Sequence, residues 1–178
     1  LTMEDTSPGY SPHDVDITFG NRYGVCRDKA ALLVAMLRIA GFEAYPVLIH
    51  AGAKMDPEIP SPYFNHAITS VASPQGSGEK YILMDPTDES SRDLMPAYLS
   101  GRSYIVARPD GEVLRTSPVP SAQENAVRIE SEGTLNRDGS MMFKSTAVFG
   151  GINDNIYRQG LLRRKKEAQR KLFESNLG

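Results

Sequence analysis

The 178-residue chain contains a single cysteine, Cys26, and no tryptophan. One cysteine excludes an internal disulfide and a multi-cysteine zinc site. The formal net charge is only −2, from 20 basic and 22 acidic residues, so nothing favours binding to nucleic acid or to a membrane surface. No apolar run reaches the roughly 18 residues of a membrane span, so we expect no membrane segment in this chain. Hydrophobic residues make up 40% of the chain, which is enough for a sizeable core.

An apolar helix is predicted directly after the cysteine. Apolar side chains recur at helical spacing, and Gly41 follows where such helices commonly stop; they are Ala30, Leu33, Val34, Leu37 and Ala40. Cys26 therefore belongs to the first turn of a helix of roughly four turns. Unpaired N–H groups and the positive end of the helix dipole favour a thiolate there. The alternative interpretation is that Cys26 is a small buried hydrophobic residue.

Strands are predicted on both sides of a turn at 73–78, over 64–71 and 80–85. A short, turn-rich connection predicts an antiparallel hairpin, which would bring His66 close to Asp85. A further strand is predicted over 42–50, where Pro46 would restrict it to an edge, a strand start or a bulge.

The chain as a whole is predicted to contain a domain over 1–117 and a truncated β-rich domain with a C-terminal helix over 122–178. Residues 1–21 are interpreted as a surface loop with His13 exposed. Two more hairpins are predicted, one joining 102–107 to 112–115 and one joining 126–135 to 140–149. A helix is predicted over 157–174, and we interpret its basic cluster as a solvated face rather than a nucleic-acid site.

Cys26, His66 and Asp85 form a candidate catalytic group. A cysteine nucleophile needs a base, and the base needs an orienting partner. An imidazole on one strand can hydrogen-bond both the thiolate and a carboxylate on the neighbouring strand. In that arrangement Asp85 fixes the tautomer of His66 and stabilises its imidazolium form.

The segments 23–30, 64–67 and 83–87 resemble the transglutaminase-like superfamily. The narrower resemblance, over roughly residues 9–115, is to bacterial transglutaminase-like proteins with a β-domain after the catalytic core. It implies an α+β, papain-like fold, with a helix packed on an antiparallel sheet. It also implies catalytic roles for Cys26, His66 and Asp85, a peptide or protein substrate and no cofactor.

The same resemblance suggests a bacterial, exported protein and a core whose N-terminal part is missing from the chain. Oligomeric state has no signal in the sequence.

Two departures from the family pattern affect the expected activity. Close relatives often have an aspartate where this chain has Val25. The oxyanion hole usually pairs the cysteine N–H with an upstream donor, a tryptophan in the animal enzymes, and this chain has no tryptophan. Losing one such donor costs about 10²–10³ in rate. No acidic loop has the spacing of calcium ligands.

Three functions remain open from the sequence. The first is thiol acyl transfer on amides, with water or an amine as the acceptor. The second is a non-catalytic peptide- or protein-binding module with the same fold. The third is a metal site built from Cys26, His66, His50 and Asp85, because zinc accepts sulfur, nitrogen and oxygen ligands.

Overall fold

The computed structural model describes residues 11–59, 61–76 and 78–174, which divide into two compact units. The first unit contains the chain up to residue 89 together with residues 94–119. The second unit contains residues 90–93 and the chain from residue 120 onward. The domain limits expected from the sequence, 1–117 and 122–178, stay a prediction.

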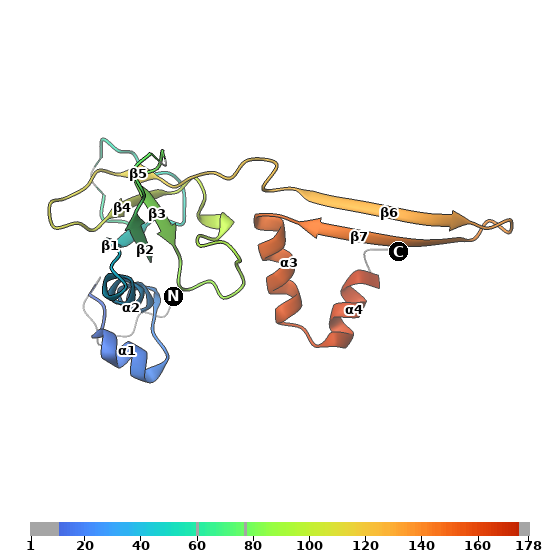
Figure 1. Ribbon diagram of the computed structural model, residues 1–178, viewed down its shortest axis with the longest axis horizontal. Coiled ribbons are helices and arrows are strands. Elements are labelled where there is room, and N and C mark those ends of the chain that lie inside the picture. The colour runs from blue at the N-terminus through green and yellow to red at the C-terminus, as the bar shows by residue number, and fades with distance from the viewer. Residues whose placement is uncertain (1–10, 60, 77, 175–178) are drawn as a thin grey trace. The chain divides into compact units, whose positions relative to one another are not determined.

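The first unit is a helix packed on a five-stranded antiparallel sheet, in the strand order β3-β2-β1-β4-β5 (Figure 1). The helix α2 (Cys26–Ile39) contacts β1 and β2, and α1 (Val15–Asn21) lies beside α2. The α+β class predicted from the sequence is confirmed. The strands are β1 (Ala44–Ile49), β2 (His66–Ala72), β3 (Tyr81–Met84), β4 (Ser103–Val106) and β5 (Arg115–Thr116).

Both faces of this sheet carry buried apolar side chains. On the face toward α2, Val34 of the helix packs with Ala44 and Val71. The opposite face holds a larger cluster that includes Leu99 of the short helix η1 (Ala97–Leu99). Successive residues of a strand face opposite sides of the sheet, and these strands bury apolar side chains on both sides.

Pro46 lies in a central strand, so the prediction that β1 is an edge strand, or that Pro46 starts it or forms a bulge, is wrong. The ladder between β1 and β4 begins only at Val47, which pairs with Val106. The Pro46 carbonyl accepts the N–H of Ala107 at 2.9 Å. Backbone N and O of one residue point the same way in an antiparallel pair. The nitrogen of Pro46 therefore faces β4 at the end of the ladder. The lack of an N–H there removes no hydrogen bond from the ladder, so it costs little stability.

Residues 15–21 form the helix α1, so the surface loop predicted over 1–21 is wrong in this part. Residues 1–10 lie outside the described residues. A seven-residue helix is marginal on its own and depends on tertiary packing. Packing of α1 against α2, with Thr18 buried, supplies that support, and sequence periodicity cannot reveal it.

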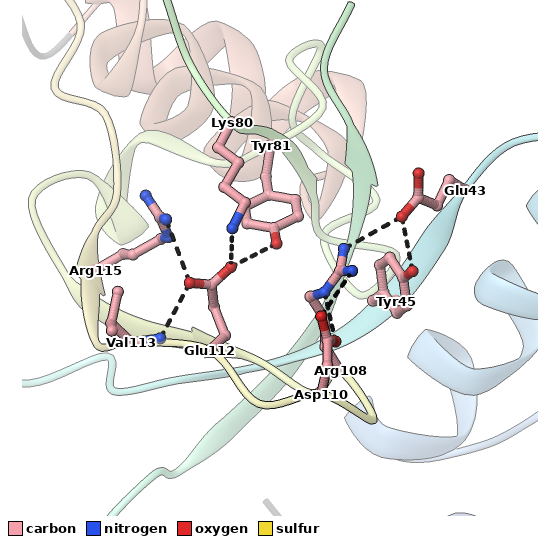
Figure 2. Close-up of polar contacts among 9 residues, drawn as sticks. All are labelled: Glu43, Tyr45, Lys80, Tyr81, Arg108, Asp110, Glu112, Val113 and Arg115. Carbon is pink, nitrogen blue, oxygen red and sulfur yellow. Dashed lines mark hydrogen bonds and ion pairs between the residues drawn. The ribbon is translucent and has the colours of Figure 1, made fainter.

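The hairpin between β4 and β5 is present, but its second strand is Arg115–Thr116 rather than the predicted 112–115. Glu112 leaves the strand because its carboxylate is held elsewhere (Figure 2). One oxygen accepts Lys80 Nζ and the Tyr81 hydroxyl, the latter at 2.6 Å. The other accepts the Val113 N–H and the Arg115 guanidinium. Residues 107–114 are thereby fastened to β3 on one side and β5 on the other.

We expect Glu112→Gln to lower the free energy of unfolding by about 2 kcal/mol at pH 7, because it removes charge-assisted hydrogen bonds from a carboxylate only 6% exposed. Hydrogen bonds from Lys80, Tyr81 and the Val113 N–H hold the pKa of Glu112 well below its usual range. A lowered folded pKa gives stability that is present above the unfolded pKa, about 4.3, and lost as pH falls further. Urea denaturation at pH 7 and pH 3 should show a smaller gap between wild type and variant at the lower pH.

The control is Glu43→Gln, which changes a 57% exposed carboxylate in the neighbouring ion pair with Arg108 (Figure 2). Exposed pairs contribute little, so this variant should unfold almost as wild type does. Equal effects of the two substitutions would contradict the role given to Glu112.

The second unit is a long hairpin of β6 (Val127–Leu135) and β7 (Met141–Phe149), which the sequence analysis anticipated, followed by two helices (Figure 1). The single helix predicted over 157–174 is wrong, because α3 (Ile152–Leu162) and α4 (Lys166–Glu174) are separate. Four consecutive basic residues, 163–166, lie at the break, where like charges destabilise a continuous helix. Gln169 then caps carbonyls freed at the end of α3.

Candidate active site

Cys26 is the first residue of α2, as predicted. The turn before it is fixed by Asp28, whose Oδ2 accepts the Val25 N–H at 3.0 Å while the Val25 carbonyl accepts the Asp28 N–H. This bond is one half of a capping box, in which the side chain of an acidic residue in the first turn accepts the backbone N–H of the residue before the helix. The orientation of Cys26 is therefore set by the helix itself rather than by a mobile loop.

His13 is not an exposed loop residue as predicted; it is half-buried and binds Asp28. Asp28 Oδ1 accepts the His13 N–H at 2.9 Å and lies 3.2 Å from His13 Nδ1. Burial raises the pKa of Asp28, but hydrogen bonds from His13 and Val25 outweigh it and hold that pKa below its usual value. A buried carboxylate thus connects the segment before α1 to the turn that carries Cys26.

His66 begins β2, and Asp85 follows the last residue of β3. The two strands pair as the predicted antiparallel hairpin, with Thr69 opposite Met84. His66 Nε2 donates to Asp85 Oδ2 at 2.9 Å. The proximity predicted from the hairpin is therefore present in the structure.

Asp85 accepts four hydrogen bonds, two on each oxygen. Oδ1 accepts the Thr87 N–H at 2.8 Å and the Thr87 hydroxyl at 2.6 Å. Oδ2 accepts the Tyr98 hydroxyl at 3.2 Å in addition to His66. Burial raises the pKa of Asp85, but hydrogen bonds from His66 and Thr87 lower it more, so the net shift is downward. Burial and the charge of Asp85 raise the pKa of Tyr98, which keeps its phenol protonated as a donor.

The Cys26 thiol and the His66 imidazole are hydrogen-bonded to each other. Because Nε2 donates to Asp85, Nδ1 is the ring nitrogen left for the sulfur. Burial raises the pKa of Cys26, but hydrogen bonds from His66 and from the backbone of Ala67 and Arg27 outweigh it, so the pKa is lowered. Burial lowers the pKa of His66, whereas its bonds to Asp85 and Cys26 raise it to about 9. Both shifts favour a thiolate–imidazolium pair near neutral pH.

This pair lies at a cavity of about 390 Å³ whose walls include Lys29, Asn65, Thr87 and Tyr98. Two donors are available beside the thiol. The Cys26 N–H, at the open end of the helix, makes no hydrogen bond within the described residues. The Asn65 side chain accepts the Ala51 N–H through Oδ1, which leaves its NH₂ group as a donor on the wall.

Sequence reasoning missed Tyr98, Thr87 and the bond from Asp28 to His13. A threonine two residues after Asp85 is a local signal, since such residues often hydrogen-bond a nearby carboxylate or backbone group. Tyr98 and His13 have no local signal, because tertiary packing alone brings them to their partners.

The metal alternative has no ligand group in the part of the chain that the structure describes. There, no three His, Cys, Asp or Glu side chains come together in a way that could hold a metal ion. His50 in particular does not join Cys26, His66 and Asp85. Among these same residues, no helix is both long enough and apolar enough to cross a membrane.

Comparison with known protein families agrees with this geometry. The family model of the transglutaminase-like superfamily matches residues 2–86, a stretch that contains Cys26, His66 and Asp85. The match covers just under half of the chain and shows a resemblance of this part to the superfamily. No curated protein and no solved structure gives a significant match.

Proposed function

We propose that this protein is a thiol enzyme that transfers acyl groups from amides of a peptide or protein substrate. The observation that carries the proposal is the hydrogen-bonded chain from the Cys26 thiol through His66 to Asp85, at the mouth of a cavity. The match of residues 2–86 to the transglutaminase-like superfamily supports the same class of chemistry. The roles of the three residues follow from their order in the chain of hydrogen bonds.

In the first half-reaction, the Cys26 sulfur attacks the amide carbonyl carbon and a C–S bond forms. The carbonyl oxygen becomes an oxyanion, and the Cys26 N–H is placed to donate to it. His66 then gives its Nδ1 proton to the amide nitrogen as the C–N bond breaks. The amine leaves, and a thioester remains on Cys26.

In the second half-reaction, water or an amine attacks the thioester while His66 accepts the proton that the nucleophile loses. The C–S bond breaks, and the thiolate–imidazolium pair returns. Throughout, Asp85 holds the imidazole in the tautomer that presents Nδ1 to the sulfur and stabilises its charged form. Water gives hydrolysis of the amide, and an amine gives transamidation.

A non-catalytic binding module is the competing interpretation, and it predicts a thiol without a base. The hydrogen bond between Cys26 and His66, with the lowered pKa of the thiol, favours the enzyme. A binding module would have no need to keep Asp85 hydrogen-bonded to that same imidazole at 2.9 Å.

The direct test incubates the protein with a glutamine-containing protein substrate and a fluorescent primary amine, and measures both incorporated amine and released ammonia. We expect ammonia release or incorporation from wild type and none from Cys26→Ala, because the substitution removes the attacking sulfur. Thermal unfolding of both proteins checks that the variant is folded. Equal signals from wild type and the folded variant would contradict the proposal.

A further inference from the structure

A second hollow, of about 530 Å³, lies beside the thiol cavity. It is lined by α1, by the turn that joins α1 to α2, and by one side of α2. Its apolar wall is formed by Phe19, Tyr23 and Leu32. Gly24 and Lys29 line both this hollow and the cavity of Cys26, so the two hollows are adjacent.

The two aromatic side chains of this hollow are exposed. Phe19 is 67% exposed and Tyr23 is 63% exposed, in a fold that buries apolar residues on both faces of its sheet. Large aromatic side chains gain much from burial, and their exposure beside a cavity marks a surface that can be covered by a ligand. The hollow therefore offers an apolar contact directly next to the thiol.

The rim of the hollow is positively charged. Arg22 and Lys29 both line it, and within the described residues neither forms an ion pair. Arg22 also has a φ of 53°, the only positive φ of a described non-glycine residue. Such a conformation is strained for arginine and is kept where the surrounding structure needs it. Here it ends α1 and turns the chain toward Tyr23.

Gly24 is a tightly packed position in the wall that the two hollows share. A Cβ atom at this position would lie 2.8 Å from Asp28 Cβ and 3.0 Å from Thr18 Cγ2. The backbone can pass this close to α2 only without a side chain. The turn that joins α1 to α2 is therefore packed tightly against both helices.

We propose that this hollow is a substrate subsite that binds an aromatic side chain of the peptide, with an acidic group next to it facing Arg22 and Lys29. This inference rests on the proposed function, since it places the reacting amide at Cys26. The apolar wall recognises the ring, and the two unpaired cations recognise the carboxylate. Specificity for peptides that carry an aromatic residue beside an acidic one follows.

The test measures the rate at which peptide electrophiles alkylate Cys26. Two series place the recognition residues on either side of the reacting carbon: chloroacetyl-Phe-Glu-amide and the chloromethyl ketone of acetyl-Glu-Phe. Each is compared with versions that have Ala for Phe, or Lys for Glu. We expect the Phe-and-Glu compound of at least one series to react about tenfold faster than either altered version, because burial of a phenyl ring contributes to binding.

Variants identify the hollow as the source of the preference. Phe19→Ser should abolish the preference for Phe, and Arg22→Asn, which tolerates the left-handed backbone, should weaken the preference for Glu. Ile39→Ser is the matched control, because Ile39 is 88% exposed at the other end of α2. It should leave both preferences unchanged.

Iodoacetamide, which has no recognition group, separates this inference from the proposed function. Fast iodoacetamide alkylation without any preference among the peptides would overturn the subsite and leave the function standing. Slow iodoacetamide alkylation would instead count against the activated thiol. A preference that survives Phe19→Ser, or a rate that rises in that variant, would also overturn the subsite, since the hollow would then be empty of substrate or filled by other parts of the chain.

Discussion

Replacing His66 with alanine should slow the alkylation of Cys26 by iodoacetamide about a hundredfold at pH 6. Alkylation follows the thiolate, and an ordinary thiol with a pKa of about 8.5 is less than about 1% ionised at that pH. In the wild-type protein the imidazolium form of His66 holds the thiolate at low pH. Removing the imidazole removes its hydrogen bond and its charge together, and leaves burial free to raise the pKa of Cys26.

The pH profile gives the sharper evidence. In wild type the alkylation rate should rise well below pH 8 and stay level up to about pH 9, where His66 loses its proton. In His66→Ala the rate should rise only through the ordinary range of a thiol. His50→Gln is the control, because among the described residues its imidazole is not a hydrogen-bond partner of Cys26 or Asp85. Matching profiles for wild type and His66→Ala would show that the pair is not formed in solution.

Local sequence signals predicted the parts of the site that lie within one element or one hairpin. Helical periodicity after Cys26 placed the thiol at a helix start, and the short turn between two strands placed His66 beside Asp85. Both inferences depend on contacts between residues close in the chain or joined by a tight turn, which patterns describe well. The bond between the thiol and the imidazole joins residues 40 positions apart, and only the residue types required by the chemistry indicated it.

The features that the sequence did not reveal depend on tertiary contacts. Glu112 was predicted to lie in a strand, yet Lys80 and Tyr81, which are 32 and 31 positions away in the chain, draw it out of the ladder. Pro46 reads as an edge residue, yet β4 ends where its missing N–H would be needed. In each case the local preference is outweighed by a partner that no local pattern specifies.

Asp85→Asn should lower the rate of amide turnover by about 10⁴, the loss that follows when the orienting group of such a triad becomes neutral. The direction of the side-chain amide can be derived from the contacts of Asp85. Thr87 gives two donors to Oδ1, so the amide oxygen of the variant must take that position. The amide NH₂ of the variant then faces His66 Nε2. If Nε2 kept its proton, two hydrogen-bond donors would face each other.

The imidazole can relieve that clash only by moving its proton to Nδ1. Its Nε2 then accepts from the new amide, and Nδ1–H points at Cys26, so the neutral ring can no longer take the thiol proton. Loss of the carboxylate charge also removes one of the two contacts that raise the pKa of His66, so the upper limit of the alkylation plateau should fall from about 9 toward the ordinary value near 6.5.

Tyr98→Phe provides the matched control for this prediction, because it removes one donor from Oδ2 and keeps the anion. Its effect on turnover should stay below about tenfold, the cost of one hydrogen bond of about 1 kcal/mol. If Asp85→Asn were no slower than Tyr98→Phe, the tautomer of His66 would not depend on the carboxylate. Two causes make the effect of Asp85→Asn much larger than that of Tyr98→Phe. The hydrogen bonds from Thr87 and Tyr98 fix which atom of residue 85 faces His66. The charge of that atom then decides whether His66 can activate the thiol.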